Sequence, residues 1–202
     1  MAGFQQAYAP DKGYRVKHHG EAYLPPDGAR ASAHEVALPE DPLAAVPVFE
    51  KNGLKVSAFR VDHQPVEPAV GYRFDYKGRS VVVSGDTKKS KSLEHNAQNA
   101  DILVHEALQP TLIQRASRVA AETGRARISK LAGDILTYHT TPIEAAEIAR
   151  DAHVKHLVFT HLVPAPTNFL IKREFLSGVS SVYSGEVTLG EDGMRFTLTP
   201  AS

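Results

Sequence analysis

A run of three valines that ends in Ser84-Gly85-Asp86 is the feature of this chain that most limits how it can fold. A β-branched apolar run such as Val81–Val83 is typical of a buried strand. Ser84-Gly85 is a turn pair that ends the strand, and the next side chain is a carboxylate. The sequence therefore predicts an acidic group, Asp86, at the point where a buried strand opens into a loop.

Three histidines occupy comparable positions. His63 follows the apolar segment 56–61, His161 follows the segment 157–160, and His139 comes two residues before a predicted helix. Because the carboxyl ends of parallel strands meet at one edge of a sheet, we expect these imidazoles and the preceding carboxylate to lie close together. An acid with several imidazoles at such an edge indicates a metal site or an acid–base site.

Each of these residues, taken alone, also fits an ordinary structural role. His63 can pair with Asp62 in a turn, and Asp86 can cap the helix that follows it. His161 can be a buried histidine bonded to a carbonyl, and His139 can bond its own loop. The four together favour the functional interpretation, because structural roles do not require all of them to gather at strand ends.

The predicted elements alternate between strands and helices from residue 53 onward, which indicates a layered α/β fold with a mixed sheet. Residues 1–50, which are rich in proline and glycine, should form a loop-rich lead-in to the same domain, with one short helix at 4–8. We expect strands at 54–61, 70–76, 79–84, 101–105 and 155–160, helices at 92–98, 108–122, 126–136 and 141–152, and a final hairpin of 186–189 with 195–198. The helix at 141–152 has a clear start, because Thr141, Pro142 and Glu144 suit a capping box with proline at the first helical position.

The composition excludes some classes of site and partner. The 23 basic and 23 acidic residues give a formal charge of zero, so a nucleic-acid substrate would need a local basic patch. The chain has no cysteine, so disulfides and thiolate ligands are excluded and a metal must bind His, Asp or Glu. No apolar run reaches membrane-spanning length and the first residues lack the core of a signal peptide. We therefore expect no membrane segment, and a cytoplasmic location if Met1 is the true start.

Five motifs occur in an order that matches a known family. They are Asp62-His63 with Gly71-Tyr72-Arg73 downstream, Val83-Ser84-Gly85-Asp86-Thr87, Ala100–Ala107, Tyr138-His139-Thr140-Thr141 and Phe159-Thr160-His161. The series resembles the metallo-β-lactamase-fold hydrolases, in the branch that contains ribonuclease Z and its phosphodiesterase and arylsulfatase relatives. The resemblance covers residues 50–165.

The resemblance implies the αββα sandwich of that family, in which two sheets pack face to face between helices. Residues 51–202 would be mainly its C-terminal half, a mixed sheet with flanking helices. It also implies a site for two zinc ions, with His63 on one ion, His161 on the other and Asp86 bridging them. Zinc binds imidazole nitrogen and carboxylate oxygen at about 2.0–2.2 Å, and two such ions about 3.5–4 Å apart can activate a shared hydroxide.

The resemblance implies roles for other residues near the zinc ligands. His139 would contact the scissile phosphate or assist the leaving oxygen, and Glu106 would orient His139 or another imidazole. His105, one residue earlier in the strand, should point to the opposite face. Lys88 and Lys89 are candidate contacts for a phosphate or sulfate at the mouth of the site, and a solvated surface fits these two lysines equally well.

One hallmark of the family is missing from these 202 residues. A His-x-His-x-Asp-His cluster supplies most of the other zinc ligands in the family, and none of the ten histidines lies in one. His18-His19 lacks the spacing and the aspartate, so we expect a solvated loop there. We therefore expect a partial site that binds one zinc ion weakly, in a chain that lacks the first half of the fold by truncation or by nature. An uncovered apolar sheet face should make this chain poorly soluble or oligomeric, for example a homodimer.

A second difference between this chain and the family bears on the expected substrate class. In tRNA-maturing ribonuclease Z, an arm that grips tRNA is inserted between the segments corresponding to His63 and Asp86, whereas only 22 residues separate them here. We therefore expect metal-dependent hydrolysis of a phosphodiester or a related sulfate ester, in a small molecule or in nucleic acid, by a zinc-bound hydroxide. The alternatives are a tRNA 3′-processing endoribonuclease and, from a different class, a non-catalytic fragment or binding module.

Overall fold

The computed structural model describes residues 2–26 and 34–201, in a chain that divides into two compact units, Met1–Ala37 and Leu38–Ser202. The described part of the first unit consists mainly of one helix, α1 (Ala2–His19), which contains Pro10. The sequence predicted only a short helix at 4–8, and that prediction was too short. Most of the described side chains of α1 are exposed, so the helix lacks the apolar stripe that signals a helix in a sequence.

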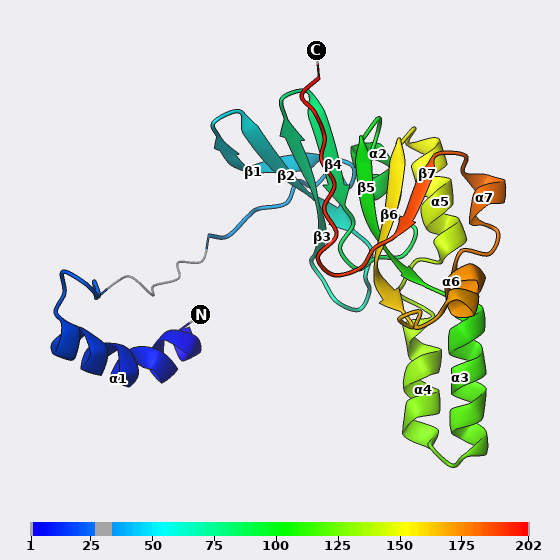
Figure 1. The fold of residues 1–202 in the computed structure, drawn as a ribbon, viewed down its shortest axis with the longest axis horizontal. Coiled ribbons are helices and arrows are strands. Elements are labelled where there is room, and N and C mark those ends of the chain that lie inside the picture. The colour runs from blue at the N-terminus through cyan, green and yellow to red at the C-terminus, as the bar shows by residue number, and fades with distance from the viewer. Residues whose placement is uncertain (1, 27–33, 202) are drawn as a thin grey trace. The chain divides into compact units, whose positions relative to one another are not determined.

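The second unit is built around one seven-stranded mixed sheet, shown in Figure 1, whose strands lie side by side in chain order. The strands from β1 to β4 are antiparallel to their neighbours, and those from β4 to β7 are parallel. The strands are β1 (Ala45–Lys51), β2 (Leu54–Val61), β3 (Ala69–Tyr76), β4 (Arg79–Val83), β5 (Ile102–Leu108), β6 (His156–Val163) and β7 (Glu186–Leu189). The predicted α/β class with a mixed sheet is confirmed.

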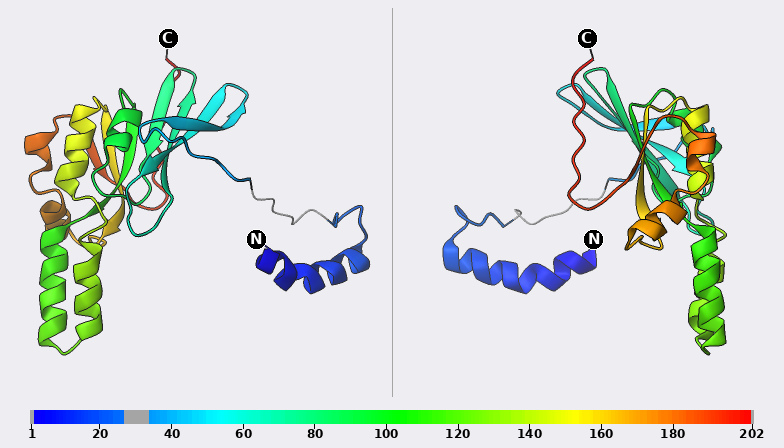
Figure 2. Two further views of the ribbon diagram at one scale, coloured as in Figure 1. Left: turned by 180° about the vertical axis from the view of Figure 1, so that it is seen from behind. Right: turned by 45° about the vertical axis from the view of Figure 1, so that its right-hand side comes forward.

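Helices cover one face of the sheet, and the C-terminal segment crosses the other face (Figure 2). The helices of this unit are α2 (Lys91–Asn96), α3 (Pro110–Glu122), α4 (Ala126–Ile135), α5 (Pro142–Asp151), α6 (Phe169–Phe175) and α7 (Val179–Val182). On the second face, the rings of Phe196 and His156 lie 5.3 Å apart between centroids. No helix among the described residues combines the length and the apolar character that a bilayer span requires.

The core lies between the sheet and the layer formed by α2 and α5. Phe59, Leu103 and Phe159 come from three strands and are fully buried. Leu93 of α2 and Ile148 of α5 meet them from the helix side. Burial of one such side chain stabilises the fold by about 1.5–3 kcal/mol, so this cluster holds the helix layer on the sheet.

The start of α5 agrees with the capping box that the sequence predicted. The Thr141 hydroxyl accepts a hydrogen bond from the Glu144 amide at 3.2 Å, and a Glu144 carboxylate oxygen accepts one from the Thr141 amide at 2.9 Å. Pro142 takes the first helical position. The cap fixes the chain direction two residues after His139, which lies in the loop that precedes it.

The predicted C-terminal hairpin was wrong. Residues 186–189 form β7, which pairs in parallel with β6, and residues 195–198 are not a strand. The backbone groups of β7 already find hydrogen-bond partners in the parallel strand β6, and the Gly190 amide extends that ladder by donating to the Phe159 carbonyl. The tail instead binds the β3–β4 hairpin, where the Arg79 Nε of β4 donates to the Thr199 carbonyl at 2.6 Å and the Ala201 amide donates to the Lys77 carbonyl in the turn. The sequence interpretation also missed β1, α6 and α7.

Asp101 ties together the amino ends of the parallel strands. Its buried carboxylate accepts hydrogen bonds from the Lys155 Nζ at 2.8 Å, the Ser80 amide at 2.9 Å and the Arg79 Nη1 at 3.1 Å. Burial raises the pKa of Asp101, but the hydrogen bonds from Lys155, the Ser80 amide and Arg79 outweigh this and hold the pKa below its ordinary value of 3.8.

Because the folded pKa of Asp101 lies below the unfolded one, its contribution to stability is present above about pH 3.8 and is lost as the pH falls through the folded pKa. We expect Asp101→Asn to lower the free energy of unfolding at pH 7 by about 1–3 kcal/mol, because two cations lose a charged partner. The difference from the unmodified chain should shrink below pH 3.8. Urea melts across pH test this, with the exposed Asp134→Asn as a control that should change little.

Candidate metal and acid–base site

The carboxyl ends of four strands meet at one edge of the sheet and bring the predicted site residues there. Strands β2, β4, β5 and β6 point the same way, as the antiparallel and parallel pairings require. His63 follows β2 and Asp86 follows β4. Glu106 lies two residues before the end of β5, and His161 lies near the end of β6. His139 joins them from the loop before α5. The edge therefore gathers one acid-rich and imidazole-rich cluster from distant parts of the chain.

Gly85 makes the turn that presents Asp86. It adopts a left-handed φ of 64°, and a Cβ added to it would lie 2.5 Å from the Val70 carbonyl oxygen. A side chain is therefore excluded both by conformation and by space. The backbone of β3 can approach the end of β4 this closely only because residue 85 is glycine.

His161 enters the site through a β-bulge. Glu106 of β5 pairs with Thr160 of β6, and Ala107 pairs with Leu162, so His161 is the extra residue. Its φ of 43° is left-handed, which is uncommon for a residue with a side chain. A bulge redirects the side chain of the inserted residue. The His161 Nδ1 consequently lies 3.6 Å from the Asp86 Oδ1.

Asp86, His139 and His161 can offer one ligand atom each, all within 4.8 Å of one another. Within the part of the chain that the structure describes, no other group of three such side chains converges as closely. The group contains two of the three predicted zinc ligands, and it also contains His139, to which the family resemblance gave a different role. His63 lies outside this group but beside it, with its ring centroid 5.4 Å from that of His139.

The hydrogen bond of His63 defines which of its nitrogens is free. Its Nδ1 lies 2.9 Å from the carbonyl oxygen of Tyr138. A carbonyl only accepts hydrogen bonds, so Nδ1 carries a proton in this contact and Nε2 is the nitrogen that remains available to a ligand. This is the arrangement that metal-binding histidines use, with the second nitrogen fixed by a backbone carbonyl.

Glu106 is the centre of the hydrogen-bond network behind the site. Its side chain is 1% exposed, and its Oε1 accepts bonds from the His139 Nδ1 at 3.0 Å and from the amides of Thr87 and Thr140 at 3.1 Å. Its Oε2 is buried without a hydrogen-bond partner among the described residues. The carboxylate thus joins the loop after β4 to the loop before α5 and sets the orientation of the His139 ring.

This carboxylate also changes the acid–base behaviour of His139. Burial lowers the pKa of His139, but the hydrogen bond and the charge of Glu106, together with the charge of Asp86, raise it above its ordinary value of 6.5. The imidazole is held as a proton donor to Glu106 at Nδ1, which leaves Nε2 for exchange with a neighbouring group.

The other charged or histidine candidates lie in structural contacts. The Lys88 Nζ is 3.9 Å from the Asp62 Oδ1, and the Lys89 Nζ pairs with Glu147 of α5. His105 is buried on the strand face of the core residues, as strand alternation predicts, and burial lowers its pKa. The predicted roles of the two lysines at the substrate stay predictions.

His18 and His19 occupy the last turn of α1 rather than the loop that the sequence predicted. Their rings contact each other edge to face, with centroids 4.6 Å apart. Both residues are exposed. A basic side chain in the last turn favourably meets the negative end of the helix dipole, which gives the pair a structural explanation.

Sequence reasoning missed three residues that hold the site together. The Thr87 Oγ1 accepts a hydrogen bond from the Asp62 amide at 3.1 Å, and the hydroxyl of the fully buried Thr140 donates one to the Thr87 carbonyl. The Tyr138 carbonyl orients His63. These residues stand directly beside Asp86 and His139 in the two motifs, and that position was the only signal in the sequence. It did not reveal their roles, because contacts made by backbone groups and hydroxyls leave no pattern in a sequence.

The donor set suits zinc in type and number. Carboxylate oxygen and imidazole nitrogen are zinc ligands, and catalytic zinc sites use three protein ligands with one position left open. The side chains of Asp86 and His161 are 41% and 49% exposed, so a ligand can reach this side of the cluster. Asp86, His139 and His161 could hold one ion of this kind, and His63 beside them is a fourth candidate donor that can replace His139 if His139 acts on the substrate.

Gly85→Ala should destabilise the protein and disturb the site. An alanine there must hold a left-handed φ and move the Val70 carbonyl, which costs about 1–3 kcal/mol for the strained conformation alone. Chemical denaturation measures the loss. Gly133→Ala in α4 is the matched control, because nothing lies within 4 Å of its Cβ and alanine stabilises a helix interior by about 0.5–1 kcal/mol. Equal effects of the two substitutions would contradict the role of Gly85.

Comparisons with known proteins agree with this edge-of-sheet site. A family model described as "Beta-lactamase superfamily domain" matches residues 2–162. The chain is 30% identical over 197 residues to a protein named "Putative ribonuclease Z" from Mycobacterium tuberculosis (strain CDC 1551 / Oshkosh), covering 96% of this chain and 77% of that one. It is 32% identical over 192 residues to "Ribonuclease Z" from Mycobacterium avium (strain 104), covering 95% and 61%.

A solved structure shows the same fold. The metallo-beta-lactamase fold protein YhfI from Bacillus subtilis aligns with a TM-score of 0.52 at 21% identity, over 74% of this chain and 51% of that one. The matched family model spans most of the chain, and the chain spans 77% and 61% of the two relatives. The family that the motif series predicted is confirmed: the chain belongs to the beta-lactamase superfamily, in the ribonuclease Z-like branch of its metallo-β-lactamase-fold hydrolases.

Proposed function

We propose that this chain is the carboxyl-terminal part of a metal-dependent hydrolase that cleaves a phosphodiester or a related sulfate ester. The convergence of Asp86, His139 and His161, in a chain of this family, is the observation that supports the proposal most strongly. The Glu106 carboxylate lies behind this group and accepts a hydrogen bond from the His139 imidazole. Ester hydrolysis needs an electrophilic centre and an acid–base group side by side, and this cluster offers donors for both.

Zinc is the proposed metal, with His63, Asp86 and His161 as its ligands in this chain. The free Nε2 of His63 and the exposed carboxylate of Asp86 support this choice. When bound, zinc polarises the ester and lowers the pKa of a water molecule, which is the origin of the nucleophile in such enzymes. The remaining ligands of a two-ion site would come from a His-x-His-x-Asp-His segment in the additional length that the relatives carry.

His139 is proposed to act on the leaving oxygen rather than to hold the metal. Its hydrogen bond to Glu106 occupies Nδ1, so only Nε2 can transfer a proton to substrate. The negative charge of Glu106 stabilises the imidazolium form that such a transfer requires. Glu106 is therefore a positioning residue in this proposal.

The names of the relatives favour a second candidate, tRNA 3′-processing endoribonuclease. Both relatives described above are named ribonuclease Z. The 22 residues between His63 and Asp86 are taken up by the loop after β2, by β3 and by β4, so no separate arm is formed there. A small phosphodiester or sulfate ester is therefore the first proposal, and precursor tRNA is the second.

The test compares substrates and metal content in the protein extended upstream along its reading frame. We expect bound zinc and hydrolysis of bis(p-nitrophenyl) phosphate, with slower cleavage of precursor tRNA. Faster cleavage of precursor tRNA at its 3′ trailer would favour the endoribonuclease. A protein that melts cooperatively but binds no metal and hydrolyses neither substrate would overturn both catalytic candidates. That outcome would support the remaining alternative, a non-catalytic fragment or binding module.

A further inference from the structure

Tyr138 lies at the candidate site with its side chain as well as with its backbone carbonyl. Its ring centroid is 5.2 Å from that of His63 and 4.9 Å from that of His139. The two imidazole centroids are themselves 5.4 Å apart. The three rings therefore form a triangle in which the phenol ring contacts both imidazoles.

Ring contacts and neighbouring hydrogen bonds fix the phenol ring of Tyr138. It meets His63 nearly edge to face, at an interplanar angle of 83°, and it meets His139 at 49°. Aromatic pairs favour edge-to-face and offset arrangements with centroids about 4.5–7 Å apart. The backbone beside the ring is held too, because the Tyr138 carbonyl accepts from the His63 Nδ1 and His139 is bonded to Glu106. The ring is therefore ordered before any ligand arrives.

The hydroxyl of Tyr138 is open to ligands. Within the described residues it has no hydrogen-bond partner. The buried side-chain atoms that lack a partner in this part of the chain are the His105 Nε2 and the Glu106 Oε2, and the Tyr138 hydroxyl is not among them. It therefore reaches solvent, although the residue as a whole is partly buried. An accessible tyrosine hydroxyl is ordinary by itself, but this one belongs to a fixed ring that borders two imidazoles of the site.

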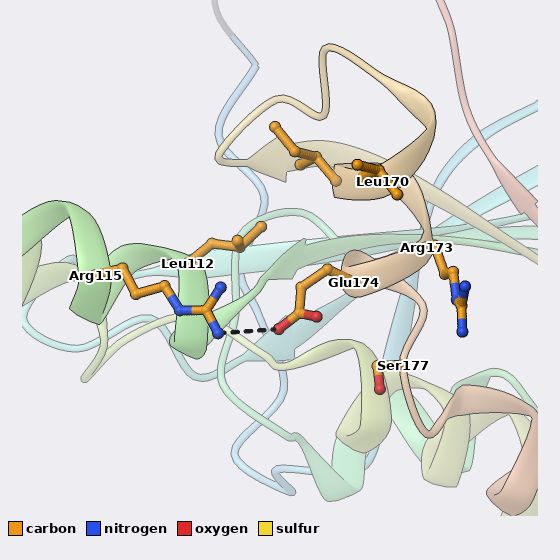
Figure 3. A pocket seen from close by; sticks show the side chains of 7 residues that line it. Leu112, Arg115, Leu170, Arg173, Glu174 and Ser177 are labelled. Carbon is orange, nitrogen blue, oxygen red and sulfur yellow. Dashed lines mark ion pairs between the residues drawn. The ribbon is translucent and has the colours of Figure 1, made fainter.

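Cations that could bind an anionic ester at this edge of the sheet are less free than this hydroxyl. Lys88 and Lys89 each lie near a carboxylate. Figure 3 shows the pocket between α3 and α6, of about 460 Å³, where the Arg115 guanidinium faces the Glu174 carboxylate across 4.0 Å. Arg173 lines the same pocket from the α6 side, apart from this pair. The hydroxyl is thus an unused donor that directly adjoins the site imidazoles.

We infer that the Tyr138 hydroxyl donates a hydrogen bond to a non-bridging oxygen of the phosphate or sulfate group that the site hydrolyses. This contact rests on the proposed function, in which the His139 Nε2 meets the leaving oxygen. A tetrahedral group placed at His139 also lies beside Tyr138, because the two rings are in contact. The hydroxyl keeps its proton and stabilises the negative charge of the oxygen that it binds. It is a substrate-binding group, and no covalent bond of Tyr138 forms or breaks.

The hydroxyl contact distinguishes tetrahedral esters from planar ones. A phosphodiester or a sulfate ester has more than one non-bridging oxygen, so one oxygen can bind a metal while another binds the hydroxyl. A carboxylic ester has a single carbonyl oxygen, which the metal would polarise. A fixed donor accelerates only a reaction in which it meets the charged oxygen. Tyr138 should therefore raise the rate with phosphate and sulfate esters and leave carboxylic esters unaffected.

Tyr138→Phe in the upstream-extended protein tests the hydroxyl, because it removes one oxygen atom and keeps the ring between the imidazoles. We expect kcat for bis(p-nitrophenyl) phosphate to fall about 10²-fold, the usual effect of removing one fixed donor, with zinc content unchanged. Hydrolysis of p-nitrophenyl acetate should change by less than about twofold, since that ester lacks the second oxygen. Tyr76→Phe is the matched control, because Tyr76 is 44% exposed and ends β3 at the opposite edge of the sheet. Equal phosphodiesterase rates of the two variants would overturn the inference.

A purely structural role of the ring has a different signature. Tyr138→Leu removes the contacts to His63 and His139 together with the hydroxyl, so it should lower both zinc content and the rate with either ester. If Tyr138→Phe is as active as the parent protein and only Tyr138→Leu loses zinc and activity, the ring is a positioning group and the hydroxyl contact is wrong.

Phosphate binding separates this inference from the proposed function, because it needs no turnover. Tyrosine is labelled with ¹³C at the ring carbon that bears the hydroxyl, and inorganic phosphate is added to the zinc-loaded, upstream-extended protein. We expect the Tyr138 signal, identified by its loss in Tyr138→Phe, to move while the Tyr76 signal stays. That movement in a protein without turnover would refute the hydrolase and support the hydroxyl contact. A Tyr138 signal that does not respond to phosphate would overturn the inference, whether or not the protein is active.

Discussion

Asp86→Ala is expected to lower kcat/KM for bis(p-nitrophenyl) phosphate by about 10³-fold or more in the upstream-extended protein. A metal ion supplies several kcal/mol of transition-state stabilisation, and each 1.36 kcal/mol corresponds to a factor of ten in rate. The Asp86 carboxylate is the proposed acidic ligand and lies 3.6 Å from the His161 Nδ1, so its removal would deprive a bound metal of its negatively charged partner. Steady-state kinetics with metal analysis of the same samples measures both consequences together.

Asp75→Ala is the matched control for this result. Its carboxylate is 44% exposed and pairs with Arg73 on β3, away from the cluster. We expect less than a twofold change in kcat/KM for this variant, because exposed ion pairs contribute about 0–1 kcal/mol to stability and this one contacts no site residue. An Asp86→Ala protein that is folded, fully loaded with zinc and as active as the Asp75→Ala control would contradict the proposed metal ligand.

Glu106→Ala is expected to lower the free energy of unfolding by about 3–5 kcal/mol, which is the usual cost of removing one partner of a buried charged network. The substitution leaves the amides of Thr87 and Thr140 and the His139 Nδ1 without their common acceptor, the Glu106 side chain, which is only 1% exposed. Thermal and urea melts of the unextended chain measure the change. For a chain of this size the midpoint should fall by about 10 °C, at about 2–4 °C per kcal/mol.

Glu147→Ala provides the comparison for Glu106. The Glu147 carboxylate is 31% exposed and has one cationic partner, Lys89 of the loop after β4. Its removal should cost no more than about 1 kcal/mol. If both glutamate variants unfold at the same midpoint, Glu106 is not the centre of a buried network.

The sequence was sufficient to predict that Asp86 and His161 come together at the sheet edge, because each comes after or near the end of an apolar strand of recognisable length. The valines before Asp86 and the segment 157–160 before His161 identify strands, and parallel pairing brings their ends together. The capping box at Thr141 likewise predicted the start of α5 and hence the loop that carries His139. These are local signals with a direct physical meaning.

Non-local features were not predictable in this way. The β-bulge that turns His161 toward Asp86 depends on the register between β5 and β6, which no single segment encodes. The predicted hairpin of 186–198 failed because β7 pairs with β6, far away in sequence, rather than with its own tail. The position of His139 beside Asp86 and His161 depends on its hydrogen bond to Glu106, a contact between residues 33 positions apart.

Zinc titration of the ¹⁵N-histidine-labelled chain, followed by NMR of the ring nitrogens, tests the proposed shared metal site most directly. We expect the Nε2 resonances of His63 and His161 to move together as one equivalent of zinc binds, and Asp86→Ala to abolish both shifts. His156, which is bonded to Thr188 on the second sheet face, should not respond. Ring signals of His63 and His161 that stay unchanged, or that move at different zinc concentrations, would contradict a common ion.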